Sequence, residues 1–151
     1  MQFILMIFTF FVSINLATAQ DFSDNTSSSL TSQAWNALNS GDHAMVIAYT
    51  DKCIELYLTQ AIGMQSSLSS LPQGNQEDVA KYWALNDVGI CLFIKGKSLL
   101  NHGDKVSAQT AFQMLVKQLS YAQCWDSNGW FWSPAEAAKK ELERLQVKTK
   151  I

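Results

Sequence analysis

The chain has 151 residues, 48% of them hydrophobic and 16% charged, and this length and balance predict one ordinary globular domain rather than two. The formal net charge is −2 at pH 7, and the sequence contains no run of Lys or Arg. A nucleic-acid-binding surface needs a strongly basic face, so the charge pattern argues against nucleic acid as a partner.

Residues 1–19 have the pattern of a signal peptide. An apolar run from Phe3 to Val12 precedes Ala17-Thr18-Ala19, which is the small-x-small pattern that signal peptidase accepts. No Lys or Arg precedes the run, which departs from the usual pattern. The run is also shorter than the about 20 apolar residues that span a bilayer. We therefore expect cleavage and export to the periplasm or the medium, with an uncleaved membrane anchor as the alternative.

Residues 20–30 are polar and rich in Ser, and they predict a flexible lead before a single α-helical domain over residues 31–148. The domain begins with helices predicted over residues 32–39 and 43–66. Gly41 breaks the first helix and Asp42 caps the second. Apolar residues recur along the second helix at the spacing of a buried stripe, among them Val46, Tyr49, Cys53, Ile54, Tyr57, Leu58 and Ile62.

A loop over residues 66–75, with Pro72 and Gly74, separates these helices from a second pair. The third helix is predicted to run without a break from about Asn75 to about residue 100, and the fourth from residue 104 to 119. Gly96 allows the two helices to approach closely, and Gly103 turns the chain between them. The small and apolar residues that face inward are Leu99, Ala108, Phe112 and Leu115.

The last helix has the clearest start signal. Ser133 caps it, Pro134 occupies the first turn, and Glu136 stands where a capping box requires an acid. One face of this helix is apolar and the opposite face is charged. A terminal helix of this kind closes the open end of a helical stack. No segment shows the alternation of a β-strand, so the sequence predicts an all-α fold.

The spacing from Gly89 to Leu115 resembles a tetratricopeptide repeat, although Lys105 stands where that family usually has an aromatic residue. Gly41, Val46 and Cys53 have the same register as Gly103, Ala108 and Leu115, which indicates a degenerate first copy. The resemblance implies antiparallel helical hairpins of tetratricopeptide type with a C-terminal capping helix. It also implies a scaffold that binds a protein or a peptide.

A second resemblance covers residues 82–89 and 121–132, which are similar to a group of small exported bacterial proteins of tetratricopeptide type. Some members of that group carry glucanase-like names. A glycosidase needs two carboxyl groups at a controlled separation. Asp126 and Glu136 are the acids near the aromatic cluster, and Glu136 already has a capping role. Asp87 is expected on the exposed side of its helix or bonded to a neighbouring turn, and the alternative is a half-buried position. We therefore expect no catalysis.

Two candidate binding sites follow. In the groove of the repeat, Phe93, Lys97 and Asn101 recur about one turn apart on one helix face. Lys97 and Asn101 are suited to a peptide carboxylate; the alternative is that Lys97 is a solvated surface residue.

The second candidate is the Trp-rich loop over residues 125–132. One interpretation is an aromatic surface that stacks on sugar rings or grips a peptide, and the other is that the rings pack between helices and hold the last helix in place. The residues of this candidate site are Trp125, Asp126, Asn128, Trp130 and Trp132.

The chain has three cysteines, Cys53, Cys91 and Cys124. For an exported protein we expect a Cys91–Cys124 disulfide with Cys53 free, and the alternative is three reduced thiols. No CxxC motif or His–Cys cluster is present, so we expect neither a metal nor a cofactor.

These features together predict an exported, non-catalytic module that binds a protein or peptide. The alternative is a cell-envelope protein that binds a glycan, or less readily hydrolyses one, through the Trp-rich loop. Because fewer than three full repeats make a marginal stack, self-association through the face around Trp35 is a further expectation.

Overall fold

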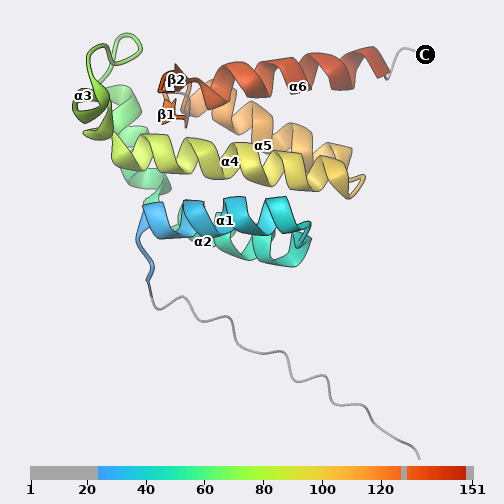
Figure 1. Cartoon of the computed structure of the whole chain (residues 1–151). Helices are drawn as coiled ribbons and strands as arrows, with labels where there is room; N and C mark the ends of the chain where they lie inside the picture. The colour runs from blue at the N-terminus through green and yellow to red at the C-terminus, as the bar shows by residue number, and fades with distance from the viewer. Residues whose placement is uncertain (1–23, 127–128, 149–151) are drawn as a thin grey trace, which may run out of the picture.

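The computed structural model describes residues 24–126 and 129–148, and within these residues the fold is all-α, as the sequence predicts (Figure 1). The described helices are α1 (Ser27–Ser40), α2 (His43–Ser66), α3 (Gln76–Ala80), α4 (Trp83–Asn101), α5 (Lys105–Gln118) and α6 (Pro134–Lys148). A small antiparallel hairpin of β1 (Cys124–Trp125) and β2 (Phe131–Trp132) precedes α6. The expected signal peptide over residues 1–19 lies outside the described residues.

The α1–α2 hairpin begins earlier than the sequence predicts. Thr26 caps α1 by accepting a hydrogen bond from the amide of Ser29, and Leu30 is fully buried. The prediction of a flexible lead is therefore wrong for residues 27–30, which form the first turn of α1. Gly41 then turns the chain at a φ of 76°, and Asp42 caps α2, as expected.

The predicted long third helix is two helices with a corner at Tyr82. The backbone of Tyr82 has a φ of −97° and a ψ of 38°, which is not helical. The side-chain amide of Asn86 donates to the carbonyl of Val79 at 3.0 Å, across the corner. Because this bond joins the first turn of α4 back to α3, it holds the bend that separates them.

The turn and the inward-facing residues of the α4–α5 hairpin agree with the sequence prediction, and α5 spans Lys105–Gln118 where residues 104–119 were expected. A Cβ atom added to Gly96 would lie 2.4 Å from the ring of Phe112, so glycine is required for the helices to approach this closely. Gly103 turns the chain at a φ of 83°. The predicted inward-facing residues are all buried: Leu99, Ala108, Phe112 and Leu115.

α4 is the central helix of the molecule, and it packs against α1, α2, α5 and α6 (Figure 1). Ser133 caps α6 by accepting from the amide of Glu136 at 3.3 Å, as expected, and α6 lies along α5. Trp35 is half-buried and packs against the core.

The β1–β2 hairpin pairs Cys124 with Trp132 and Trp125 with Phe131. Two-residue strands carry no alternating pattern, so the sequence did not indicate them. Within the part of the chain that the structure describes, no helix has the length and apolar character needed to cross a bilayer.

Candidate functional site

The three cysteines are free thiols in the structure, so the expected Cys91–Cys124 disulfide is not formed. Cys91 is fully buried with its sulfur 3.3 Å from the hydroxyl of Thr31 on α1. The pKa of Cys91 is raised well above its ordinary value, mainly by the hydrogen bond with the thiol of Cys53 and also by burial. Cys91 therefore faces α1 and α2, while Cys124 lies in the β-hairpin and its sulfur contacts the carbonyl of Trp125 at 3.7 Å.

The groove residues lie along α4, but two of them are engaged by the C-terminal part of the chain. The ammonium of Lys97 lies 2.8 Å from the carboxylate of Glu141 on α6. Phe93 packs edge-on against Trp132, with ring centroids 5.5 Å apart. Asn101 is exposed at the end of α4. The structure thus places Lys97 in a contact between α4 and α6.

The contact with Lys97 affects the pKa of Glu141. Burial raises the pKa of Glu141, but the hydrogen bond and charge of Lys97, together with Arg144, outweigh burial and leave that pKa below its ordinary value. The ionised form of Glu141 is therefore favoured in the folded protein.

The tryptophans of the Trp-rich loop differ in how far they are exposed to solvent. Trp132 is half-buried against Phe93, which agrees with a packing role. Trp130 is 61% exposed and Trp125 is 43% exposed, so these two rings do not belong to the core. The amide of Asp126 donates to the carbonyl of Trp130 at 3.0 Å and closes the loop, while Asn128 lies outside the described residues.

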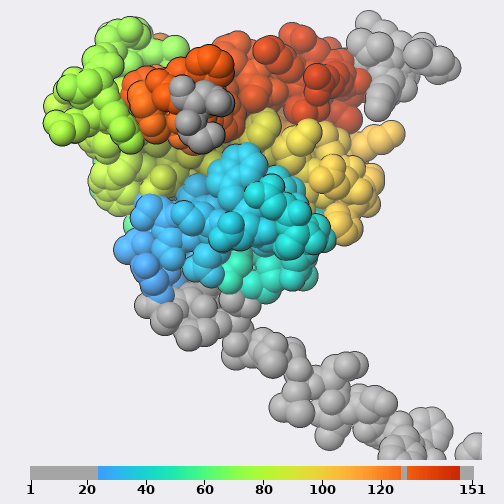
Figure 2. All heavy atoms as spheres, in the orientation of Figure 1, coloured from blue at the N-terminus to red at the C-terminus, as the bar shows by residue number. Residues whose placement is uncertain are grey.

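The β-hairpin, the α3–α4 corner and the start of α1 surround a cleft of about 300 Å³. Figure 2 shows the face on which these three parts of the chain meet. The lining residues are Ser28, Gln76, Val79, Ala80, Trp83, Asn86, Asp87, Ile90, Gln123, Cys124, Trp125 and Phe131.

Three of the residues that line this cleft are aromatic. Trp83, at the start of α4, is 39% exposed and rests edge-on against Tyr57, with ring centroids 5.6 Å apart. Trp125 rests edge-on against Phe131, with ring centroids 4.8 Å apart. Each tryptophan is thus held in place by a second ring and still presents surface to a ligand.

Two buried amides line the cleft, and both are bonded to the backbone. Asn86 accepts from the amide of Gln123 at 2.9 Å and donates to Val79, and the side chain of Gln123 donates to the carbonyl of Pro72 at 2.8 Å. These two amides hold the walls together.

Asp87 is the lining residue with an acidic side chain, and its carboxylate accepts a hydrogen bond from the hydroxyl of Ser27. Burial raises the pKa of Asp87, and the hydrogen bond from Ser27 lowers it by less. Among the described residues, no Lys, Arg or His forms an ion pair with this carboxylate.

Sequence reasoning missed this cleft as a site. It placed Trp83 on the buried side of a continuous helix, and for Asp87 it favoured the exposed side or a bond to a neighbouring turn over a half-buried position. The structure brings both residues to the start of a separate helix, opposite the hairpin, with Trp83 exposed and Asp87 half-buried and bonded to Ser27 in the first turn of α1. The available signal was Asp87, an acid among apolar residues of its helix, but its hydrogen-bond partner Ser27 lies 60 positions away in the chain.

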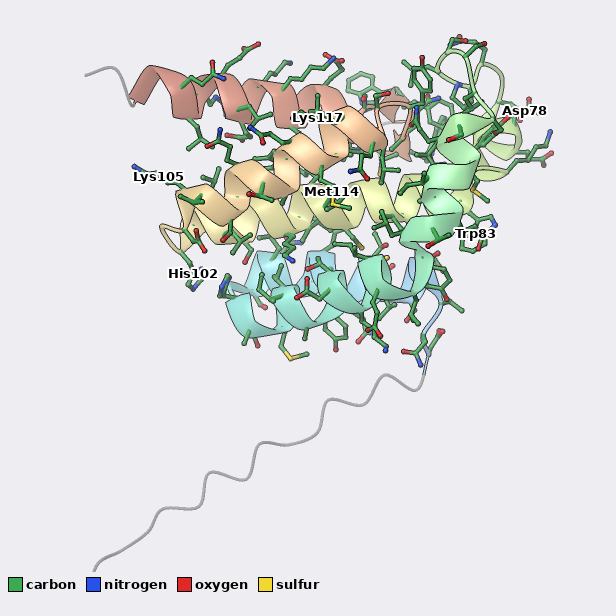
Figure 3. All side chains as sticks on the ribbon, turned by 180° about the vertical axis from the view of Figure 1, so that it is seen from behind. Asp78, Trp83, His102, Lys105, Met114 and Lys117 are labelled. Carbon is green, nitrogen blue, oxygen red and sulfur yellow. The ribbon has the colours of Figure 1, made fainter. Side chains whose placement is uncertain are left out.

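The other end of α4 carries a second polar feature. His43 and His102 stack with ring centroids 3.8 Å apart, and Nδ1 of His43 lies 2.8 Å from the hydroxyl of Ser98. His102 lies at the α4–α5 turn, at the opposite end of α4 from Trp83 (Figure 3). The described residues include no group of three or more His, Cys, Asp or Glu side chains that could hold a metal ion.

Comparison of the chain with models of known protein families, with curated proteins and with solved structures gave no match.

Proposed function

We propose that this protein is an exported, non-catalytic helical-repeat module that binds a segment of another protein in the cleft between α3, α4 and the β-hairpin. The observation that carries the proposal is that Trp83 of α4 and Trp125 of β1 are exposed and line the same cleft, which also contains the half-buried Asp87. Apolar walls with a few placed polar groups are typical of ligand sites.

The size of the cleft favours a short segment over a folded domain. Its volume of about 300 Å³ matches one or two side chains and is at the lower end for ligand pockets. A side chain that enters it would serve as an anchor, and the neighbouring residues of the partner would lie over the exposed surface of α3 and the hairpin.

The architecture supports the same proposal. The hairpins α1–α2 and α4–α5, each with a glycine turn followed by an Asp cap, have the spacing that led us to a tetratricopeptide-type repeat. Proteins built this way act mainly as scaffolds for partners. Export rests on the signal-peptide pattern of residues 1–19.

The test is selection of peptides from a displayed random library on the mature protein, followed by binding measurements on two variants. Ala80→Trp adds bulk at an exposed position of the cleft lining without removing a buried contact. Val106→Trp adds the same bulk at a position on α5 that is 77% exposed and outside the lining. Enriched peptides should lose affinity for the Ala80→Trp variant and keep it for the Val106→Trp variant. Equal binding to both variants would place the peptide site elsewhere, and failure to enrich any peptide would contradict the proposal.

The exposure of Trp130, at 61%, favours a second candidate function, which is binding of a cell-envelope glycan on the hairpin. An exposed indole ring stacks readily on the apolar face of a sugar. Trp130→Ala should abolish retention on insoluble cell-wall polysaccharide and leave thermal stability unchanged, because the ring is outside the core. Retention that survives this change would remove the glycan hypothesis.

A further inference from the structure

We infer that the cleft recognises a lysine side chain of the bound segment, with its ammonium against Asp87 and its methylene stem against the rings of Trp83 and Trp125. The inference rests on the proposed function and names the residue type that the cleft selects.

The charge of the cleft favours a cation. Asp87 is the lining residue with a carboxylate, and the lining contains no Lys, Arg or His. A carboxylate has about four acceptor positions, and within the described residues Ser27 is the side chain that donates to it. A partially desolvated carboxylate without a counter-ion is unfavourable, and burial accordingly raises the pKa of Asp87. A bound cation would supply the missing charge and further donors.

The depth of the carboxylate favours lysine among the cations of proteins. Asp87 is half-buried, whereas Trp83 and Trp125, which line the same cleft, are exposed. A ligand must therefore carry its charge past the rings on a slender apolar stem. The lysine side chain has a compact ammonium on four methylene groups, while the guanidinium of arginine is broad and an amino-terminal amine has no stem. Indole rings also attract cations through their π faces.

The two buried amides of the cleft, Asn86 and Gln123, are engaged within the protein. Both ends of the Asn86 side chain are already bonded, one to the carbonyl of Val79 and one to the amide of Gln123. The side chain of Gln123 donates to Pro72. These two amides maintain the walls, and the charged acceptor that a ligand would meet in the lining is the carboxylate of Asp87.

The experiment uses four peptides of five residues, each with a fluorescein at its C-terminus and four glycines around one central position. Three have an acetylated N-terminus and carry lysine, norleucine or arginine at the centre, and the fourth has a free N-terminus and norleucine. Fluorescence anisotropy is measured while each peptide is titrated with the mature protein and with two variants. Asp87→Asn removes the charge of the cleft and can still accept from Ser27. Asp51→Asn is the matched control, because Asp51 is an exposed residue of α2 that pairs with Lys95 outside the cleft.

The lysine peptide should bind about 10–100-fold more tightly than each of the other three, as expected for a hydrogen-bonded charge pair. Asp87→Asn should remove that advantage, and Asp51→Asn should leave it intact. Equal binding of the lysine and capped norleucine peptides, or a lysine preference that survives Asp87→Asn, would overturn the inference while leaving the cleft as a peptide site. Tighter binding of the peptide with the free N-terminus would identify an amino terminus as the ligand and would also overturn it. Binding of none of the four would overturn it too, and the library selection then decides the proposed function separately.

Discussion

The hydroxyl of Ser27, in the first turn of α1, donates a hydrogen bond to the carboxylate of Asp87 in α4. The two residues are 60 positions apart in the chain, and the bond joins the start of the first helix to the central helix at the edge of the cleft. Ser27 is buried and Asp87 is half-buried, so the contact is partly shielded from water. The bond therefore both orders the beginning of α1 and orients the acid of the candidate site.

Removal of this donor should destabilise the protein. Ser27→Ala leaves a half-buried carboxylate without its side-chain donor, and we expect a loss of about 1–2 kcal/mol in the free energy of unfolding. Urea denaturation followed by circular dichroism measures the change. Ser32→Ala is the matched control, because Ser32 is exposed on the same helix, and that change should stay within about 0.5 kcal/mol. Equal effects of the two substitutions would mean that the contact with Asp87 contributes nothing.

The raised pKa of Asp87 predicts how stability depends on pH. The folded chain binds a proton at Asp87 more tightly than the unfolded chain, whose aspartates titrate near the ordinary value of 3.8. Ionisation of Asp87 therefore lowers the free energy of unfolding above its folded pKa, and this cost disappears as the pH falls through that pKa. Asp87→Asn should thus be more stable than the wild type near neutral pH, and the difference should shrink as the pH is lowered toward about 4. A difference that grows on acidification, in urea denaturation across this range, would show that the pKa is lowered instead.

The close approach of α4 and α5 predicts a sharp contrast between two glycines. A Cβ at Gly96 would lie 2.4 Å from the ring of Phe112, so Gly96→Ala should cost about 1–3 kcal/mol through overpacking. A Cβ at Gly63, in α2, would meet no atom within 4 Å, and Gly63→Ala should stabilise the protein by about 0.5–1 kcal/mol. Thermal unfolding of the two variants checks both signs. A Gly96→Ala variant as stable as the wild type would contradict the packing of this hairpin.

The state of the cysteines predicts a thiol count. In denaturant, all three thiols of the purified protein should react with a chromogenic disulfide reagent. In the native protein Cys124 should react first, because it is partly exposed while Cys53 and Cys91 have no exposed surface; burial raises the pKa of Cys124 as well, so this reaction should be slow. A single reactive thiol in denaturant would contradict the three free thiols, and peptide mapping would then show whether the pair is the Cys91–Cys124 disulfide that the sequence suggested.

Features set by local spacing were predictable from the sequence. Gly96 and Phe112 lie on neighbouring helices joined by a short turn, so their contact follows from helical periodicity and from Gly103. The cap of α6 at Ser133 is likewise a property of adjacent residues. Local rules decided these elements because the partners are close in the chain.

Features set by distant partners were not predictable. The Ser-rich residues 27–30 looked flexible, but Ser27 has its partner at Asp87, and Leu30 is buried by the rest of the core. The break at Tyr82 is held by a bond from Asn86 to Val79, which no periodicity signals. The cleft combines residues of α1, α3, α4 and the hairpin, so its existence depends on the tertiary fold.

The central claim, that the cleft is the binding site, is tested most directly by nuclear magnetic resonance of the indole N–H groups. The chain has five tryptophans, so a ¹⁵N-labelled sample gives five indole signals, which single Trp→Phe variants assign. On addition of a library-selected peptide, the signals of Trp83 and Trp125 should shift, and those of Trp35 and Trp132 should stay in place. A peptide that binds while the signals of Trp83 and Trp125 remain unchanged would contradict the account.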